Sequence, residues 1–316
     1  MIYATVAFLA STSVAFGYDA TSASRTPAIT EEMINFVNSQ PHATWKATRN
    51  VRFANATVAD VKRLLGTIMP GEQGYIGPDV ERTSFKLGAQ DIPESFDVRE
   101  AWPKCASITG HVRDQSNCGS CWAFGSVEAF NDRHCITTGD STTLFSPEDV
   151  AACCSGVHCQ FSMGCNGGQP AGAWSWFTKY GVSTGGDYSN VGDGSSCKPY
   201  TLESCAHHVS PPPGMKSCTD VQTYKTPKCT DSCSDGKYGS TYSSDKKKFH
   251  AQSSYGVRGV ENMQKELMEK GTLSVAMQVY EDFEAYSSGV YQHVSGDYLG
   301  GHAIKIVRRD LNGRLD

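Results

Sequence analysis

The chain has 316 residues, of which 39% are hydrophobic and 19% are charged, and its formal net charge is −5. This length can bury a sizeable core, the negative charge argues against a nucleic-acid-binding surface, and the lack of any run of about 18 apolar residues argues against a transmembrane helix. The thirteen cysteines all lie between Cys105 and Cys233, and an odd number in one block predicts six disulfides, one free thiol and an oxidising compartment.

Residues 1–17 have the features of a secretory signal, namely a short apolar stretch that ends in small residues. The stretch begins without Lys or Arg, so the alternative is an N-terminus that is buried or disordered. The cysteines favour secretion independently, because dense disulfides persist in oxidising compartments.

The cysteine-free stretch that follows predicts two short helices. Thr30 can cap the first, which runs through Val37, and Thr57 with Asp60 forms a capping box for the second. Two helices of this size cannot bury their apolar faces alone, so we expect them to lie on another part of the chain. The Gly- and Pro-rich residues 70–78 indicate a linker.

The cysteine-rich remainder predicts helices followed by strands. Helices begin at Ser146-Pro147 and Gln169-Pro170, where proline occupies the first helical position, and a third helix covers 260–270. Alternating side chains predict strands over 273–279 and 302–307. Helices that precede strands without a βαβ rhythm indicate an α+β fold.

Two further features concern charge and loops. The third helix carries oppositely charged side chains four residues apart, which can stabilise it: Glu261/Lys265 and Glu266/Lys270. Residues 197–255 are rich in Pro, Ser, Lys and Cys and have little periodicity, so we expect a long loop held by disulfides.

The strongest chemical signal surrounds Cys121. The run from Gln115 to Cys121 leads into apolar residues with helical spacing, so Cys121 is predicted to begin a helix, where peptide dipoles favour a thiolate. Such a thiolate needs a cationic partner, usually an imidazole, and Gln115 could donate a hydrogen bond to an oxyanion beside Cys121. The alternative is that Cys121 pairs with another cysteine in a structural disulfide.

Five motifs carry a family resemblance, and they are spread along the chain: Ile92–Arg99, Cys118–Trp122, Gly164–Gly168, Cys205–His208 and Gly300–Ala303. The Cys-Gly-Ser-Cys-Trp run is the signature around a papain-type cysteine. Together the motifs resemble the papain family of cysteine peptidases, and cathepsin B more closely than papain. The resemblance begins at a propeptide-like stretch near Phe36 and covers almost the whole chain.

This resemblance implies an α+β fold of two subdomains, one helical and one β-rich, with the reactive pair facing across a cleft. Cys121 would be the nucleophile, and His302 its general base and ion-pair partner. Gln115 would complete an oxyanion hole with the backbone N–H of Cys121. Gly167 and Gly168 would let a substrate backbone approach closely, because neither has a Cβ. Substrates would be peptides and proteins, and no cofactor or metal is expected.

The resemblance also implies a precursor made of three segments: a signal at 1–17, a short helical propeptide at 18–91 and a peptidase domain at 92–316. The propeptide would inhibit its own chain until removed. We expect a monomer of the secretory pathway, located in the lysosome or outside the cell, without nucleic-acid partners.

Residues 197–233 would include an occluding loop, which blocks one end of the cleft in cathepsin B. Its His207 and His208 would bind the C-terminal carboxylate of a substrate, so the enzyme would release dipeptides as well as cut internal bonds. Mildly acidic pH would strengthen this binding, because His gains charge near its pKa. The alternative is that both histidines are loop surface without a role.

The resemblance implies a disulfide pairing that leaves Cys121 unpaired: Cys105–Cys135, Cys118–Cys165, Cys153–Cys229, Cys154–Cys159, Cys197–Cys233 and Cys205–Cys218. Spacing alone does not choose this connectivity. A competing interpretation is a zinc site formed by Cys153, Cys154, His158 and Cys159. It is disfavoured because the spacing lacks two clean ligand pairs.

The end of the sequence departs from the family. The chain ends at Asp316, fourteen residues after His302, whereas the family has a later Asn that orients the histidine, followed by further strands. Asn312 does not stand in that context and is not assigned the role. The β-rich part is therefore expected to be incomplete, as in a truncated chain. The alternatives to an active peptidase are an impaired binding protein, a chain that does not fold, or a disulfide-rich structural module.

Overall fold

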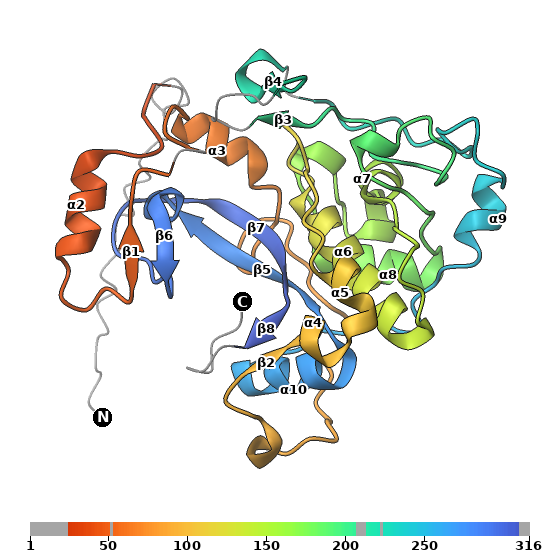
Figure 1. The fold of residues 1–316 in the computed structure, drawn as a ribbon, viewed down its shortest axis with the longest axis horizontal. Coiled ribbons are helices and arrows are strands. Elements are labelled where there is room, and N and C mark those ends of the chain that lie inside the picture. The colour runs from red at the N-terminus through yellow and green to blue at the C-terminus, as the bar shows by residue number, and fades with distance from the viewer. Residues whose placement is uncertain (1–24, 51–52, 207–212, 222–223, 310–316) are drawn as a thin grey trace, which may run out of the picture.

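The structure is a computed structural model that describes most of the chain: residues 25–50, 53–206, 213–221 and 224–309. Helices gather on one side of the molecule and the longer strands on the other (Figure 1), which is the predicted α+β arrangement. The predicted signal at 1–17 lies outside the described residues, as do His207, His208 and Asn312.

Helix α6 (Cys121–Thr138) is the centre of the helical part. Helices α7 (Pro147–Cys153) and α8 (Pro170–Lys179) pack against it. Both begin where predicted, and Ser146 caps α7 by accepting a hydrogen bond from the N–H of Asp149. The largest side chains in the core between these helices are aromatic: Trp122, Phe130, Phe145, Trp176 and Phe177.

The β part consists of paired strands. Strands β5 (Leu273–Tyr280) and β7 (Tyr298–Ile306) run antiparallel, with Met277 opposite His302. Strand β7 begins four residues before the predicted start, because it includes two glycines that carry no alternation signal. Within the described residues, each sheet has two strands.

Helix α10 (Val260–Lys270) has the predicted bounds and packs beside β5. Of its two predicted charge pairs, Glu261/Lys265 is present with 2.5 Å between Nζ and Oε1. The predicted pairing of Glu266 with Lys270 was wrong, because the Glu266 side chain is buried and pairs with Arg82 and Arg133 instead. Helical spacing does not reveal partners that come from elsewhere in the fold.

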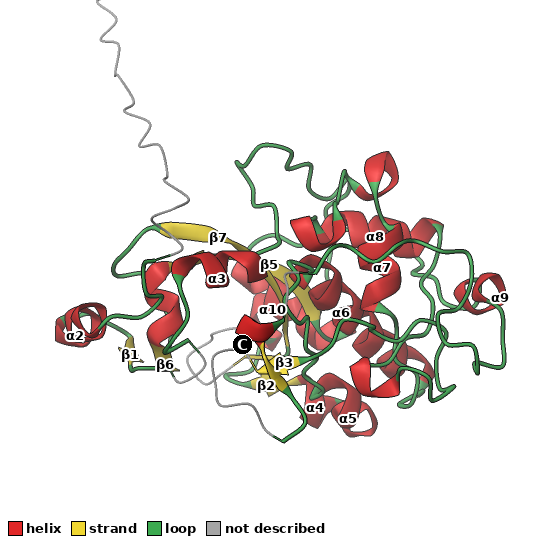
Figure 2. Ribbon diagram, turned by 90° about the horizontal axis from the view of Figure 1, so that it is seen from above, coloured by secondary structure: helices red, strands yellow, loops and turns green. Residues whose placement is uncertain are grey.

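The N-terminal helices lie on the β part, which provides the support they were expected to need. Helix α2 (Glu31–Ser39) and strand β1 (Trp45–Ala47) cover strand β6 (Tyr286–Gly289), with Trp45 buried between them. Helix α3 (Val58–Leu64) lies along β7 (Figure 2) and packs on Leu299.

Both predicted caps of these helices are present. The Thr30 side chain accepts a hydrogen bond from the N–H of Met33 at 3.2 Å, and Thr57 and Asp60 form the capping box. The predicted linker at 70–78 consists of turns and loop. The caps therefore fix where each helix starts, while the β part provides its packing surface.

The remaining elements are short. They are β2 (Phe96–Asp97), β8 (Arg308–Arg309), α4 (Val98–Ala101), α5 (Ala106–Thr109), and the 3₁₀ helices Ala89–Asp91, Pro103–Cys105, Gly156–Cys159, Gly164–Asn166, Tyr188–Asn190, Cys218–Asp220 and Glu281–Ala285. Strand β2 pairs with β8, which ties the segment after residue 92 to the last strand described. Among the described residues, no helix has the length and apolar character to cross a membrane.

Six disulfides cross-link the chain, and they join the six pairs that the resemblance implied. Cys121 is the free cysteine of the described residues. Because Cys153, Cys154 and Cys159 are all in disulfides, their thiolates are not available to bind zinc.

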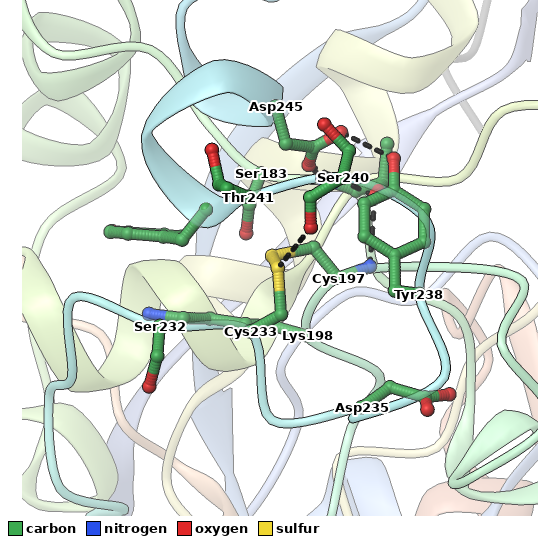
Figure 3. Close-up of a disulfide and its surroundings, with 12 residues drawn as sticks. Ser183, Cys197, Lys198, Ser232, Cys233, Asp235, Tyr238, Ser240, Thr241 and Asp245 are labelled. Carbon is green, nitrogen blue, oxygen red and sulfur yellow. Dashed lines mark hydrogen bonds between the residues drawn. A yellow bond between two sulfur atoms is a disulfide. The ribbon is translucent and has the colours of Figure 1, made fainter.

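The predicted loop at 197–255 contains short regular elements. Strand β3 (Cys205–Ala206) pairs in parallel with β4 (Lys216–Ser217), and α9 (Tyr242–Lys246) follows later. Figure 3 shows the Cys197–Cys233 disulfide near Asp245, which accepts a hydrogen bond from the hydroxyl of Tyr238 at 2.6 Å. Elements this short leave no periodic pattern in a sequence.

Candidate active site

Cys121 occupies the first position of α6, and 1% of its surface is exposed. The first N–H groups of a helix have no partner within the helix and carry partial positive charge, so this position favours a thiolate. The neighbouring Trp122 is buried and donates from Nε1 to the carbonyl of Gly164 at 3.0 Å. This bond fixes the start of the helix against the loop that carries Gly167 and Gly168.

A close approach of two backbones places β7 beside α6. A Cβ added at Gly125 would lie 3.2–3.3 Å from backbone atoms of Ala303 and Ile304, closer than ordinary van der Waals contact. Gly125 lies about one helical turn after Cys121, and Ala303 follows His302. The contact therefore brings the two candidate catalytic residues to one place.

A buried ion pair joins the same two elements further along. Lys305 of β7 places Nζ 3.1 Å from Asp132 and 3.6 Å from Glu128, both on α6. The Asp132 side chain is buried and also accepts a hydrogen bond from the hydroxyl of Thr272 at 2.8 Å. Breaking a buried pair by removing one partner is strongly destabilising, so this link resists separation of β7 from α6.

Cys121 and His302 shift each other's pKa. Burial raises the pKa of the Cys121 thiol, but interaction with the His302 imidazole, together with hydrogen bonds to Thr67 and to the Ala303 backbone, lowers this pKa overall. Burial lowers the pKa of His302, but interaction with Cys121 and the charge of Glu284 raise it overall. Opposite shifts of this kind favour a thiolate–imidazolium pair. Nδ1 of His302 is buried and has no hydrogen-bond partner in the described part of the chain.

A segment from the N-terminal part crosses this site. The N–H of Gly66 donates to Cys121 Sγ at 3.2 Å, and the Thr67 hydroxyl lies 3.2 Å from the same sulfur. On one side, the N–H of Thr67 donates to the carbonyl of Gly301 at 3.0 Å. On the other, the N–H of Gly168 donates to the carbonyl of Gly66 at 2.8 Å. The segment therefore bridges the helical part and β7 over the sulfur.

Gln115 meets the same segment. Its Nε2 donates to the carbonyl of Leu64 at 3.0 Å and to that of Cys118 at 2.8 Å. The side-chain amide therefore already binds a backbone carbonyl that passes near Cys121.

The two neighbouring glycines are constrained for different reasons. Gly167 has a φ of 106°, which side chains rarely tolerate, and an added Cβ would lie 3.1 Å from the carbonyl oxygen of Gly66. A Cβ at Gly168 would instead lie 2.6 Å from the ring of Trp122. The backbone of Gly66 therefore leaves little room for a side chain at Gly167, whereas the ring of Trp122 leaves none at Gly168.

The structure gathers five of the predicted site residues around this segment: Cys121, His302, Gln115, Gly167 and Gly168. His207 and His208 lie outside the described residues, but the chain that leads to them does not. The Ser116 hydroxyl donates to the carbonyl of Glu203 at 2.5 Å. The chain that leads into the loop closed by the Cys205–Cys218 disulfide therefore lies beside the segment that precedes Cys121.

Four residues around the site carried no recognisable sequence signal. Gly66 and Thr67 contact the sulfur, Glu284 acts on the pKa of His302, and Gly125 permits the approach of β7. These residue types are common, and only the fold gives them importance. The position of Gly66, directly after a capped helix, is the one feature that could have drawn attention.

Comparisons with known proteins agree on one family. The family model for papain family cysteine proteases matches residues 92–312, and the model for the peptidase family C1 propeptide matches 29–71. A cathepsin B-like cysteine proteinase of Schistosoma japonicum is 38% identical over 90% of this chain and 78% of the relative. Cathepsin B-like cysteine proteinase 6 of Caenorhabditis elegans is 41% identical over 88% of this chain and 70% of the relative.

Solved structures show the same relationship. Procathepsin B S9 from Trypanosoma congolense has a TM-score of 0.68 and 29% identity, and the match covers 92% of this chain and 86% of that one. A recombinant stem bromelain precursor shares the fold with a TM-score of 0.56 and 19% identity, over 90% of this chain and 74% of that one. Both are precursor forms, so the fold is that of a propeptide-bearing peptidase.

The substitution Gly66→Ala should expose Cys121, because the added Cβ would lie 1.7 Å from the backbone oxygen of Gly119 and the crossing segment must move. We expect iodoacetamide to alkylate Cys121 in the native full chain at least about tenfold faster, since local opening then costs less free energy. Timed labelling followed by mass spectrometry gives the rate. Gly239→Ala is the control, because a Cβ there meets nothing within 4 Å. Equal rates in the two variants would contradict the assigned contact.

Proposed function

The chain belongs to the papain family of cysteine proteases, and on that premise we propose that it is a cathepsin B-like peptidase in which Cys121 and His302 carry out hydrolysis. The observation that carries this proposal is the close contact of α6 with β7 at Gly125, which brings Cys121 and His302 to one place. The opposite shifts of their pKa values favour the charged pair. The start of α6 at Cys121 supports it, because the helix dipole stabilises the same thiolate.

In the proposed reaction, the Cys121 thiolate attacks the carbonyl carbon of a peptide bond and forms a tetrahedral intermediate. The oxyanion accepts hydrogen bonds from Nε2 of Gln115 and from the backbone N–H of Cys121. The His302 imidazolium gives its proton to the leaving amine, and an acyl-enzyme thioester remains. The neutral ring then takes a proton from water while the water oxygen attacks the thioester carbon. The second tetrahedral intermediate breaks its C–S bond, so the product acid leaves and the thiolate–imidazolium pair forms again.

Substrate backbones are proposed to pair with Gly168. Its N–H donates to the carbonyl of Gly66 at 2.8 Å, and its carbonyl accepts from the N–H of Ile68 at 3.0 Å. Both backbone groups are therefore able to hold an extended peptide beside Cys121.

The crossing segment is proposed to be the inhibitory part of the propeptide. It forms hydrogen bonds with the sulfur of Cys121, the side-chain amide of Gln115 and the backbone of Gly168. These are the groups that a substrate needs. Hydrolysis then requires its removal, so the chain is made as a zymogen. We assign the propeptide to 18–91 and the peptidase domain to 92–316.

A signal at 1–17 and a location in the lysosome or outside the cell complete this proposal. Six disulfides support it, because they persist in oxidising compartments. The peptidase is proposed to act as a monomer on peptide and protein substrates.

We also propose that the peptidase releases dipeptides from the C-termini of its substrates. His207 and His208 follow β3 directly, inside the loop closed by the Cys205–Cys218 disulfide. The hydrogen bond from Ser116 to Glu203 holds the approach to this loop five residues before Cys121. Protonated imidazoles at that place would bind a substrate carboxylate beyond the cut.

Gln115→Ala should lower kcat for peptide hydrolysis by about 100- to 1,000-fold after the propeptide is removed, because one oxyanion donor is lost. Cys121→Ala should abolish hydrolysis. Gln278→Ala, which changes an exposed glutamine on β5, is the control and should leave kcat unchanged. A fluorogenic peptide gives the rates. Hydrolysis that survives Cys121→Ala would refute the assigned nucleophile.

The pH dependence of kcat/KM should show a plateau bounded by the two shifted groups. Activity rises as pH passes the lowered pKa of Cys121, because the thiolate forms, and falls as pH passes the raised pKa of His302, because the imidazolium is lost. The plateau should therefore begin well below the ordinary thiol pKa of about 8.5. A profile that rises only near that ordinary value contradicts the ion pair.

His207→Ala/His208→Ala should remove any preference for a peptide with a free C-terminal carboxylate over its amide. Each lost charge-assisted hydrogen bond should weaken binding of the acid by about 1.5–3 kcal/mol. In the parent enzyme the preference should be strongest below the imidazole pKa, while cleavage of internal bonds should persist in the variant. Equal kcat/KM for acid and amide in the parent enzyme would exclude dipeptide release by this pair.

A further inference from the structure

A second anchor of the N-terminal part lies on α10. Residues 72–91 fall between the propeptide match and the peptidase match, and neither family model covers them. Within this stretch Arg82 reaches across to α10, where one guanidinium nitrogen pairs with Glu266 and the other with Glu269. Each carboxylate therefore receives its own donor from one side chain.

The two carboxylates are built into the peptidase domain. With Arg82 in place, the Glu266 side chain is fully buried and that of Glu269 is 8% exposed. Glu266 keeps its orientation through Arg133, 2.9 Å away, and through the hydroxyl of Tyr255 at 2.7 Å. Without Arg82, Glu266 keeps Arg133 as its cation, whereas Glu269 loses the cation with which it pairs.

The backbone around Arg82 also forms hydrogen bonds with the peptidase domain. The N–H of Arg82 donates to the carbonyl of Gly256 at 2.9 Å, in a strand-like pairing. Oε1 of Glu269 accepts from the N–H groups of Lys86 at 2.6 Å and Leu87 at 3.0 Å. The site thus contacts the backbone at Arg82 and again at Lys86 and Leu87, where the chain bends.

The chemistry of the site favours arginine over lysine. A forked guanidinium can donate to two carboxylates at once, whereas an ammonium is a compact point charge. The guanidinium carbon of Arg82 also lies 5.9 Å from the ring centroid of Tyr255, within range of a cation–π interaction.

This site is separate from the sulfur. Arg133 lies twelve residues after Cys121 along α6, which corresponds to roughly 18 Å of helix. Figure 1 shows α10 at the opposite end of the molecule from α3, which leads into the crossing segment. A ligand at α10 therefore does not occupy the hydrolytic site.

We propose that Glu266, Glu269, Tyr255 and Gly256 form an arginine-binding site of the peptidase domain for peptide segments. Arg82 fills this site in the precursor. Loss of residues 72–91 vacates it for an arginine-bearing segment of another peptide or protein. The proposal rests on the proposed removal of the propeptide but not on the catalytic roles assigned above, since it concerns binding alone.

The test uses the full chain with Cys121→Ala, which prevents self-cleavage, and measures chymotrypsin cleavage after Phe85. Adding Arg82→Ala should speed this cleavage by at least about tenfold, because charge-assisted hydrogen bonds that hold the segment are lost. Ethylguanidinium should restore protection in the Arg82→Ala chain, and ethylammonium should not. Adding Glu269→Gln to that chain should abolish the rescue.

Thr83→Ala is the matched control, because it changes an exposed neighbour of Arg82. It should be cleaved at the parent rate and should not respond to ethylguanidinium. Arg82→Lys, which keeps the charge and the fold, should be protected less than the parent. Cleavage of Arg82→Ala at the parent rate, or equal rescue by both cations, would overturn the proposal.

A binding measurement tests the peptide ligand directly. A fluorescently labelled peptide of residues 79–88 should compete with the chain's own weakened segment in the Arg82→Ala variant. It should bind more tightly than the same peptide with citrulline in place of its arginine, because citrulline keeps the shape and loses the charge. Equal affinities would show that the guanidinium is not recognised, and would also overturn the proposal.

Discussion

The contact between the backbones of α6 and β7 at Gly125 is the constraint on which the rest of the site depends. It leaves no room for a Cβ and sets β7 one helical turn from the start of α6. The buried pair of Lys305 with Asp132 holds the two elements in the same relation. Because His302 lies on β7 and Cys121 begins α6, the pair forms from two elements far apart in sequence without any flexible loop.

The same geometry explains how the N-terminal part can cover the site. Gly66 passes close enough to Cys121 to donate a hydrogen bond to the sulfur, and it contacts Gly168 on the other side. Further along, Arg82 fastens the chain to α10. One segment therefore passes over the sulfur of Cys121, while a second, chemically different anchor lies on another surface.

Much of the local structure could be predicted because it depends on neighbouring residues. The caps at Thr30 and Thr57, the bounds of α10 and the start of α6 at Cys121 all follow from short-range patterns. The early start of β7 was missed because its glycines show no alternation. The partners of Glu266 were missed because they lie far away in sequence. The disulfide pairs came from the resemblance, since spacing does not choose among them.

The claim that His302 controls the ionisation of Cys121 is tested most directly by titrating the thiolate in His302→Gln. The ultraviolet absorbance of the thiolate is followed against pH in the full chain, with Cys121→Ala as the blank. Burial raises a thiol pKa and a neighbouring imidazolium lowers it, so the account predicts that removal of the imidazole raises the pKa of Cys121 above its value in the parent chain. A pKa that stays at the parent value would contradict the account.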